Sequence, residues 1–403
     1  NFAITVELFQ ERYNVPSAIL PSGEYRQITG NQALALGCVT ASSCSGISLL
    51  YSSYPITPAS DILHELAQYK NFGIKTIQAE DEIAAISSSI GSAFGGVLAV
   101  TGTSGPGLDL KSEALGYAVM TELPIVLLNV QRGGPSTGLP TKAEQTDLLA
   151  AMYGRHGEAP VPILAPSTPG DCFFIVLEAF RIAIKFMTPV IVLSDGGLAN
   201  SSEPWKIPNF EEFPDLKPTF HKDPKGFSPY HRNQNTLARN WAIPGTPGLE
   251  HRIGGLEKDS ETGEINYEPE NHEKMVLIRD EKIQRIKKDL PPLNVFGPDK
   301  NKLLVLTWGS VYGPSLTAIE ELQKEGYAVS MLNLNHLYPF QENLGAILTR
   351  FEKVLVPEMN LGQLSHLVRA EYLIDAISFS KLQGRPFLIS EIREKILDIL
   401  KNF

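Results

Sequence analysis

Pro-Ile-Val-Leu-Leu-Asn-Val at residues 124–130 and Pro-Val-Ile-Val-Leu-Ser-Asp at residues 189–195 are the stretches that decide the fold. Both are apolar throughout instead of alternating with polar residues, which is typical of strands covered by helices on both faces. Two further β-rich runs, 73–78 and 96–101, alternate with helical stretches in the same part of the chain. This alternation is the pattern of βαβ units and predicts an α/β fold built on a parallel sheet.

The length of 403 residues exceeds what one hydrophobic core usually supports, so we expect two domains. The composition shifts to Pro, Asn, His and charged residues at 201–300, which we interpret as a long connection with ordered loops, including a helical pattern at 273–288. We therefore predict an N-terminal linker at 1–30, a first α/β domain at 31–200 and a smaller α/β domain with its own core at 301–403.

The overall charge and the cysteines exclude several classes of protein. A formal net charge of −10 argues against nucleic acid or a membrane surface as partner, because phosphate binding needs clustered Lys and Arg. The cysteines, Cys38, Cys44 and Cys172, form no Cys-x-x-Cys pair, so we expect neither a disulfide framework nor an iron–sulfur cluster held by this chain alone.

The absence of a long apolar run, and of a signal-peptide pattern at the start, predicts an acidic enzyme of the cytoplasm. The chain begins with Asn instead of Met and continues through a polar, Pro-containing stretch at 15–30. We therefore expect that further sequence precedes it.

The first candidate segment is Tyr-Pro-Ile-Thr-Pro at residues 54–58, ahead of a predicted helix at 59–69. Its two prolines stiffen the turn, and the Thr57 hydroxyl together with helix N-terminal amides could bind an anion. A threonine that caps a helix before a proline at the first helical position explains the same residues equally well.

The second candidate segment is Gln-Ala-Glu-Asp-Glu at residues 78–82, between a β-rich run and a helix of small residues. Three carboxylates at a helix N-terminus are favoured by the helix macrodipole, which is a sufficient structural explanation. If one of them points inward beside a cofactor, it could instead protonate or polarise a ring nitrogen.

Two glycine-rich segments complete the set. Thr-Gly-Thr-Ser-Gly-Pro-Gly at 101–107 permits close approach of a ligand but lacks the ending of a P-loop, so it is weak evidence for a phosphate site. Arg132 opens a glycine-rich stretch at 131–141, at the carboxyl end of the strand 124–130, where ligands of parallel sheets gather. It could bind a carboxylate in bidentate fashion, or pair with Glu144 or Asp147.

The histidines offer no spacing that predicts a metal site, and no Ser-His-Asp or Cys-His arrangement can be argued from spacing. We therefore assign no metal to this chain. His251, in Gly-Thr-Pro-Gly-Leu-Glu-His-Arg at 245–252, is most simply a loop histidine.

The order and spacing of these segments resemble the 2-oxoacid:ferredoxin oxidoreductases, from about Gly30 onward. The segments at 245–257, Pro-Glu-Met-Asn-Leu-Gly-Gln-Leu at 357–364 and Gln-Gly-Arg-Pro-Phe at 383–387 look like the 2-oxoglutarate branch. The resemblance implies a thiamine diphosphate-binding domain of the pyrimidine type with a parallel sheet, followed by a smaller domain like the C-terminal domain of transketolase.

The resemblance also implies roles for individual residues. The family's glutamate for the pyrimidine nitrogen maps onto Glu80, counting back from the Thr-Ser-Gly motif, with Glu82 as the fallback. It would promote loss of the proton from the thiazolium C2. The implied substrate-binding residues are Thr57, Arg132 and Thr141, and the implied cofactor contacts besides Glu80 are Tyr54, Pro55 and Ile56.

The chain contains no Gly-Asp-Gly followed by Asn to hold Mg²⁺ and diphosphate, and no cluster cysteines. The resemblance therefore implies a beta-type subunit that supplies the Mg²⁺ site and a [4Fe-4S] cluster, in an (αβ)2 assembly. The implied reaction oxidises 2-oxoglutarate with coenzyme A to succinyl-CoA and CO2 and reduces ferredoxin, in either direction. The family's gamma-type domain has no counterpart in this sequence, which leaves the coenzyme A contacts open.

Two alternatives remain at the level of the sequence. The same chemistry could act on pyruvate or a branched 2-oxoacid. If the substrate is 2-oxoglutarate, His251 or Arg252 in the connection are candidates to meet its distal carboxylate. A non-catalytic scaffold that kept the fold is the other, although it would have no chemical need for Thr57, Glu80 and Arg132 together.

Overall fold

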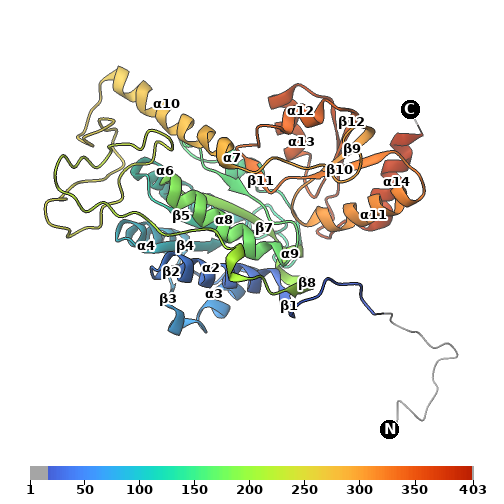
Figure 1. Ribbon diagram of the computed structural model, residues 1–403, viewed down its shortest axis with the longest axis horizontal. Helices are drawn as coiled ribbons and strands as arrows, with labels where there is room; N and C mark the ends of the chain where they lie inside the picture. Colours follow the sequence, from blue (N-terminus) through green and yellow to red (C-terminus); the bar gives the residue numbers. More distant parts are fainter. Residues whose placement is uncertain (1–16, 402–403) are drawn as a thin grey trace, which may run out of the picture.

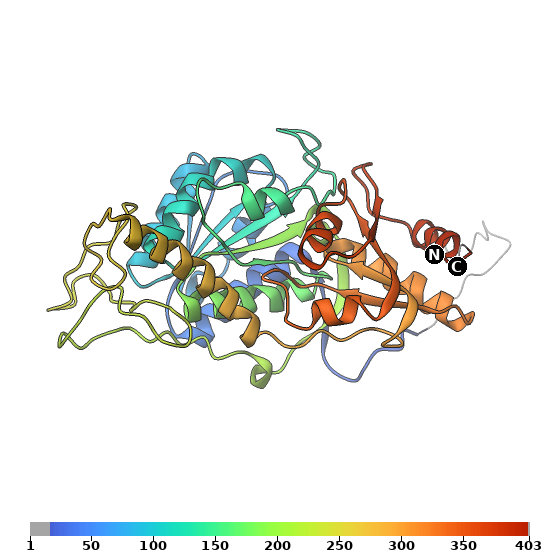
Figure 2. The ribbon, with the colours of Figure 1, turned by 90° about the horizontal axis from the view of Figure 1, so that it is seen from above.

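The computed structural model describes residues 17–401 and divides them into two α/β domains joined by a long connection. The larger domain lies beside the smaller one, and the loops of the connection extend beyond the far end of the larger domain (Figures 1 and 2). The predicted fold class, a parallel-sheet domain followed by a smaller α/β domain, is confirmed.

The larger domain is built on a seven-stranded sheet in which every neighbouring pair is parallel except the edge pair of β11 and β6. The β11 strand comes from the second half of the chain, so the two domains share this sheet. In spatial order the strands are β11 (His336–Tyr338), β6 (Ile163–Leu164), β7 (Val190–Asp195), β5 (Ile125–Gln131), β4 (Leu98–Thr103), β2 (Leu49–Ser53) and β3 (Ile74–Gln78).

Helices cover both faces of this sheet, as the apolar strands predicted. On β5, Val126, Leu128 and Val130 pack with α2 and α8, whereas Leu127 faces the opposite core. The helices of this part of the chain are α2 (Gly30–Ser45), α3 (Ser60–Leu66), α4 (Glu82–Phe94), α5 (Pro106–Leu110), α6 (Ser112–Thr121), α7 (Leu148–Tyr153), α8 (Asp171–Phe186) and α9 (Gly196–Asn200).

A separate two-stranded ribbon precedes α2. It pairs β1 (Tyr25–Thr29) antiparallel with β8 (Ser202–Lys206). The end of the region predicted as a linker is thus a strand, and residues 1–16 of that region lie outside the described residues. Thr29 then caps α2, because its hydroxyl accepts the backbone N–H of Gln32 while the Gln32 side chain accepts that of Thr29.

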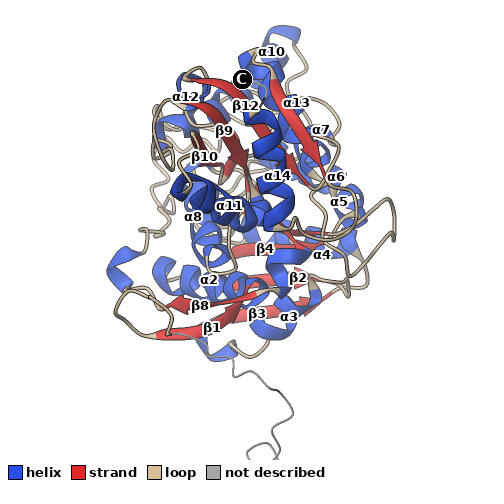
Figure 3. Ribbon diagram, turned by 90° about the vertical axis from the view of Figure 1, so that its right-hand side faces the viewer, coloured by secondary structure: helices blue, strands red, loops and turns tan. Residues whose placement is uncertain are grey.

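The smaller domain has a parallel four-stranded sheet, with α11 and α14 together on one face (Figure 3). That face has its own core, but the other face, including Leu304 and Leu306, shares a core with Leu127 and Leu193 of the larger domain. Its elements are β10 (Val329–Asn333), β9 (Asn301–Thr307), β12 (Phe351–Glu358), β13 (Ala376–Ser380), α11 (Tyr312–Lys324), α12 (Leu344–Leu348), α13 (Gln363–Tyr372) and α14 (Ile389–Leu400).

The connection contains one long helix, α10 (Pro269–Arg285), where the sequence predicted a helix at 273–288. A cluster of buried charges, which we call the Glu122 cluster, anchors it to the larger domain. Glu122 follows α6, and its carboxylate bonds the guanidinium of Arg232 at 2.6 Å and the ammonium of Lys282. Arg239 donates to the carbonyls of Thr121 and Glu122. These cations lie at the C-terminus of α6, the negative end of its dipole.

Candidate active site

Four neighbouring strands, β5, β4, β2 and β3, deliver the predicted site segments to one edge of the larger sheet. Arg132 follows β5, the segment 103–107 ends β4 and opens α5, Thr57 follows β2, and Glu80 follows β3. Because these strands are parallel, their carboxyl ends meet at the same edge, where ligands of open α/β sheets bind. Residues up to 75 positions apart in sequence therefore come together.

Behind this edge, buried side chains converge on the hydroxyl of Tyr54. It lies 2.9 Å from the hydroxyl of Thr103 and in hydrogen-bonding contact with the carboxylate of Glu82. Burial first, and then the neighbouring Glu82, raise the pKa of Tyr54. A Cβ atom at Gly107 would stand only 2.0 Å from the Tyr54 Oη and 2.3 Å from the Thr103 Oγ1. Glycine at position 107 is therefore required by the packing of Tyr54 against Thr103, whether or not a ligand binds nearby.

Gly107→Ala is expected to destabilise the chain by about 1–3 kcal/mol, because the new methyl group overpacks the contact between Tyr54 and Thr103. Thermal unfolding measures the effect. Gly116→Ala is the matched control, since nothing lies within 4 Å of its Cβ position on α6. It should be neutral or stabilising, because alanine favours the helix. Equal stability of the two variants would contradict the packing at Gly107.

The three carboxylates at 80–82 take different positions. Asp81 is the N-cap of α4 and accepts the backbone N–H of Ala84 at 2.8 Å, so the structural explanation holds for this residue. Glu82, the first residue of α4, is half-buried beside Tyr54. Glu80 lies exposed at the edge of the sheet, ahead of the helix. Of the three, Glu80 is placed to meet a ligand or another subunit at this edge.

The turn at 54–58 does not use Thr57 as a helix cap. The helix α3 begins at Ser60, and the Ser60 hydroxyl instead accepts the backbone N–H of Ile56 at 2.9 Å. Thr57 is exposed, as is Pro55, while Ile56 is half-buried. The Thr57 hydroxyl is therefore exposed on the turn and does not cap α3.

Arg132 is 7 % exposed and donates from Nη1 to the carbonyl oxygen of Thr57 at 2.7 Å. Its buried Nε has no partner among the described residues. The alternative ion pairs with Glu144 or Asp147 are not formed; the Asp147 carboxylate instead accepts the Asn129 amide at 2.9 Å. A buried guanidinium with an unused donor is suited to an anionic ligand.

The loop that follows Arg132 is held by the smaller domain. Gln145 is fully buried, and it exchanges hydrogen bonds with the backbone of Met359 and donates to the carbonyl of Trp308. Asn360 donates to the carbonyl of Gln145 at 2.7 Å. The segment 357–364 thus positions the loop, and Thr141 lies exposed on it.

Two ionisable groups near this edge have a shifted pKa that the sequence does not predict, although Asp147 was already a candidate partner of Arg132. Lys111 is fully buried at the start of α6, and Asp147 lies beside Asn129. Burial raises the pKa of Asp147 to about 6. No signal in the sequence could have identified Lys111, because Leu-Asp-Leu-Lys-Ser-Glu at 108–113 reads as an ordinary amphipathic segment.

His251 and Arg252 do not reach this edge within the chain. His251 packs against Phe94, the last residue of α4, and its Nδ1 bonds the carbonyl of Leu249. Since α4 runs back from the end of β3 to the start of β4, Phe94 lies at the opposite, amino edge of the sheet. Within this chain His251 thus lies away from the edge that carries Thr57, Glu80 and Arg132, and its contact with a distal carboxylate stays a hypothesis.

Within residues 17–401, no group of three His, Cys, Asp or Glu could hold a metal ion, and no helix is long and apolar enough to cross a membrane. The three cysteines are unpaired, with Cys38 and Cys172 buried.

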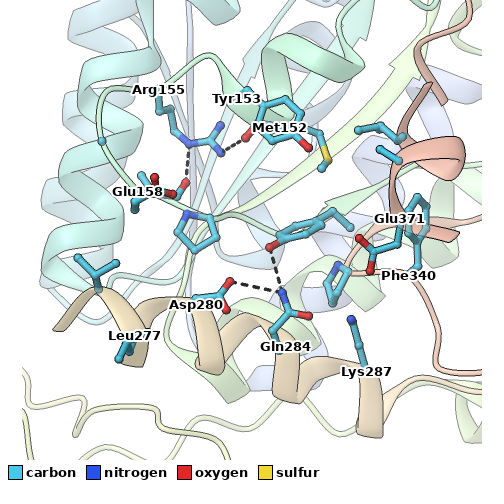
Figure 4. A pocket seen from close by; sticks show the side chains of 18 residues that line it. Met152, Tyr153, Arg155, Glu158, Leu277, Asp280, Gln284, Lys287, Phe340 and Glu371 are labelled. Carbon is cyan, nitrogen blue, oxygen red and sulfur yellow. Dashed lines mark hydrogen bonds between the residues drawn. The ribbon is translucent and has the colours of Figure 1, made fainter. Parts of the chain in front are cut away.

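A cleft of about 720 Å³ lies between α10, the end of α7 and the smaller domain, and none of the predicted site residues lines it (Figure 4). The Arg155 guanidinium within it donates to the carbonyls of Ala151, Met152 and Ala159. Gln284 bridges toward Tyr338, with 3.1 Å between Nε2 and Oη. Because none of the predicted site residues lines this cleft and backbone carbonyls satisfy its Arg155, we assign it no ligand.

Comparison with known families places the chain in a class of thiamine diphosphate proteins. The thiamine diphosphate-binding region of the pyruvate flavodoxin/ferredoxin oxidoreductases matches residues 38–270, and core domain II of pyruvate:ferredoxin oxidoreductase matches residues 301–392. The chain belongs to this family, as the sequence motifs predicted.

Individual relatives are consistent with the 2-oxoglutarate branch. The chain is 55% identical to the 2-oxoglutarate oxidoreductase subunit KorA of Mycobacterium tuberculosis, over 97% of this chain and 60% of that protein. It is 36% identical to the 2-oxoglutarate synthase subunit KorA of Archaeoglobus fulgidus, over 94% of this chain and 99% of the relative. The chain therefore spans the whole of one relative but about 60% of the other.

Solved structures agree with the fold. A 2-oxoglutarate:ferredoxin oxidoreductase from Magnetococcus marinus, with 2-oxoglutarate, coenzyme A and succinyl-CoA bound, superposes with a TM-score of 0.89 at 36% identity, over 93% of this chain and 65% of that one. A split-gene transketolase shares the fold with a TM-score of 0.53 at 11% identity.

Proposed function

We propose that this chain is the alpha-type part of a 2-oxoglutarate:ferredoxin oxidoreductase, which oxidises 2-oxoglutarate with coenzyme A to succinyl-CoA and CO2 and reduces ferredoxin. The observation that carries the proposal is the meeting of Arg132, Thr57 and Glu80 at one edge of the sheet, with the Arg132 Nε buried and unpartnered. A scaffold protein has no chemical need for a buried guanidinium, an exposed hydroxyl and an exposed carboxylate together at this edge.

The residues fit one half of a thiamine diphosphate site. Glu80 is an exposed carboxylate at the edge, available to a ring nitrogen of the pyrimidine, while the described residues offer no cluster of acids for Mg²⁺. We infer that a beta-type subunit docks at this edge in an (αβ)2 assembly and supplies the Mg²⁺–diphosphate site and a [4Fe-4S] cluster. When bound, thiamine diphosphate supplies the electron sink for decarboxylation.

The residues of this chain then have separate tasks. Glu80 holds or moves a proton at the pyrimidine nitrogen, with Tyr54, Pro55 and Ile56 as further cofactor contacts. The Arg132 guanidinium binds the C1 carboxylate of the substrate, and Thr57 donates to it from the exposed turn. Thr141 approaches from the loop that the smaller domain positions.

The test is to co-express the chain with its genomically neighbouring beta-type subunit and to measure coenzyme A-dependent viologen reduction with 2-oxoglutarate, pyruvate and 2-oxoisovalerate. A strong preference for 2-oxoglutarate supports the proposal. A preference for another acid retains the reaction and changes the substrate. No activity in a complex with bound cofactor and cluster would overturn it.

Arg132→Ala is expected to weaken 2-oxoglutarate binding by about 2–5 kcal/mol, or roughly 30- to 5000-fold, because the C1 carboxylate loses its buried charge partner. Substrate KM and cofactor affinity are measured in the same complex, and cofactor affinity should change little. Lys185→Ala is the control, because Lys185 is a cation on α8 that bonds Asp289 instead. An unchanged substrate affinity in Arg132→Ala would remove Arg132 from the site.

A further inference from the structure

Lys111 lies directly behind the proposed active site, and its side chain is fully buried. Its ammonium donates to the backbone carbonyl of Glu82 at 2.9 Å and to the hydroxyl of Thr101 at 3.0 Å. It also stands 5.3 Å from the centre of the Tyr54 ring, within the range of a cation–π contact. One side chain thus touches α4, β4 and the turn at 54–58.

These three contacts join the segments that carry the proposed chemistry. The Glu82 carbonyl lies two residues after Glu80, and Tyr54 begins the turn that presents Thr57. Glu80 and Thr57 are themselves exposed, so their own side chains do little to fix the backbone around them. The order of both segments therefore depends on the buried contacts beneath them.

The charge of Lys111 is only partly compensated. The acceptors of its hydrogen bonds are a carbonyl and a hydroxyl, both neutral oxygens. The charged groups that face it are Glu82, the first residue of α4, and Asp81, the N-cap of α4. A lysine serving only as packing would be replaced without loss by an apolar side chain, since burying an ammonium is costly.

We propose that Lys111 is a positioning residue whose protonated side chain holds the segment at Glu80 and the turn at Thr57 in the arrangement needed for turnover. This proposal rests on the function proposed above. Loss of the proton removes the cation–π contact with Tyr54 and the charge-assisted character of both hydrogen bonds. Turnover therefore requires the ammonium form.

The pH dependence follows from burial. Burial, against the attraction of Glu82 and Asp81, lowers the pKa of Lys111 to about 7. The ammonium is present below this pH and is lost as the pH rises through it. Turnover by the assembled enzyme is expected to fall as the pH rises above about 7.

Lys111→Arg keeps its charge and should move this decline in turnover to higher pH by more than about one unit. Lys111→Met should lower kcat by about 10- to 100-fold at pH 7 and abolish the decline.

The structural part of the proposal is tested without activity. In the full chain, hydrogen–deuterium exchange of the amides at 54–60 and 80–86 should rise in Lys111→Met and stay unchanged in the smaller domain. Thr101→Val, which removes one acceptor and keeps the side-chain volume, should raise exchange in the same segments to a lesser degree. A lysine 13Cε resonance that titrates near pH 7 should be present in the wild type and absent in Lys111→Arg.

The outcomes separate this proposal from the proposed function. If the wild-type complex oxidises none of the 2-oxoacids, the function fails, yet the exchange and resonance measurements still test Lys111. Unchanged exchange in both variants, or pH profiles of Lys111→Arg and Lys111→Met that are scaled copies of the wild-type profile, would overturn the positioning role.

Discussion

Glu80→Gln is expected to lower the turnover of the assembled enzyme by about 10²- to 10⁴-fold while leaving the fold intact. The amide keeps the size of the side chain but cannot share a proton with the pyrimidine nitrogen as a carboxylate does. The fold should survive because Glu80 is exposed and precedes the helix whose N-terminus is capped by Asp81. The direct measurement is the rate at which the proton at the thiazolium C2 exchanges with solvent in the complex.

Glu82→Gln tests which glutamate meets the pyrimidine nitrogen. Glu82 is the neighbouring candidate, but it contacts Tyr54 and is not exposed at the edge of the sheet. Glu352→Gln provides a control at an exposed glutamate of the smaller domain. If C2 exchange stays near normal in Glu80→Gln and collapses in Glu82→Gln, the two roles are reversed. Thermal unfolding of Glu80→Gln and Glu352→Gln, at exposed positions, should remain close to that of the wild type.

Much of the fold could be predicted from the sequence because its strands are short, apolar and separated by helices. The strand predicted at 124–130 is β5 (Ile125–Gln131), and that at 189–195 is β7 (Val190–Asp195). The β11 strand (His336–Tyr338) could not be predicted. Its three residues pair only with β6, across more than 170 positions of sequence, and no local pattern encodes such a contact.

The sequence pointed to those residues of the proposed site that lie in a motif, but not to those whose environment is created by burial. Arg132 was a candidate because it follows an apolar strand in a glycine-rich stretch. Whether it pairs with a nearby acid or is left for a ligand could be decided only from the structure, where it bonds Thr57. The position of Glu80 outside α4 and of Glu82 inside it depends on the cap at Asp81. Lys111 could be identified only in the structure, from its hydrogen bonds to Thr101 and Glu82, which lie 10 and 29 residues away in the sequence.

Glu122→Gln is expected to destabilise the chain by about 3–5 kcal/mol, because the Glu122 cluster would lose its central carboxylate. Arg232, Lys282 and Arg239 would remain buried together, and the amide cannot neutralise them. With an unfolding entropy of about 2.1 cal/mol/K per residue, each kcal/mol corresponds to about 1 °C in a chain of 403 residues, so the melting temperature should fall by roughly 3–6 °C. Circular dichroism of the full chain measures the transition.

The matched control is Glu261→Gln, the same substitution in the same connection. Glu261 pairs with His231 at 3.2 Å, but both side chains are 65% exposed, so its loss should cost less than about 1 kcal/mol. If Glu122→Gln and Glu261→Gln have the same melting temperature, the Glu122 cluster does not anchor the connection.

The difference in melting temperature between wild type and Glu122→Gln should also depend on pH. Burial raises the pKa of Glu122, but the attraction of Lys282 and Arg232 outweighs it and holds the pKa well below its usual range. A carboxyl group whose pKa is lower in the folded chain stabilises it above the unfolded value, near 4.5, and loses this contribution as the pH falls further. The gap in melting temperature between wild type and Glu122→Gln should therefore be widest above about pH 5 and narrow in acid. A gap that did not depend on pH would mean that the variant acts through lost hydrogen bonds and not through charge.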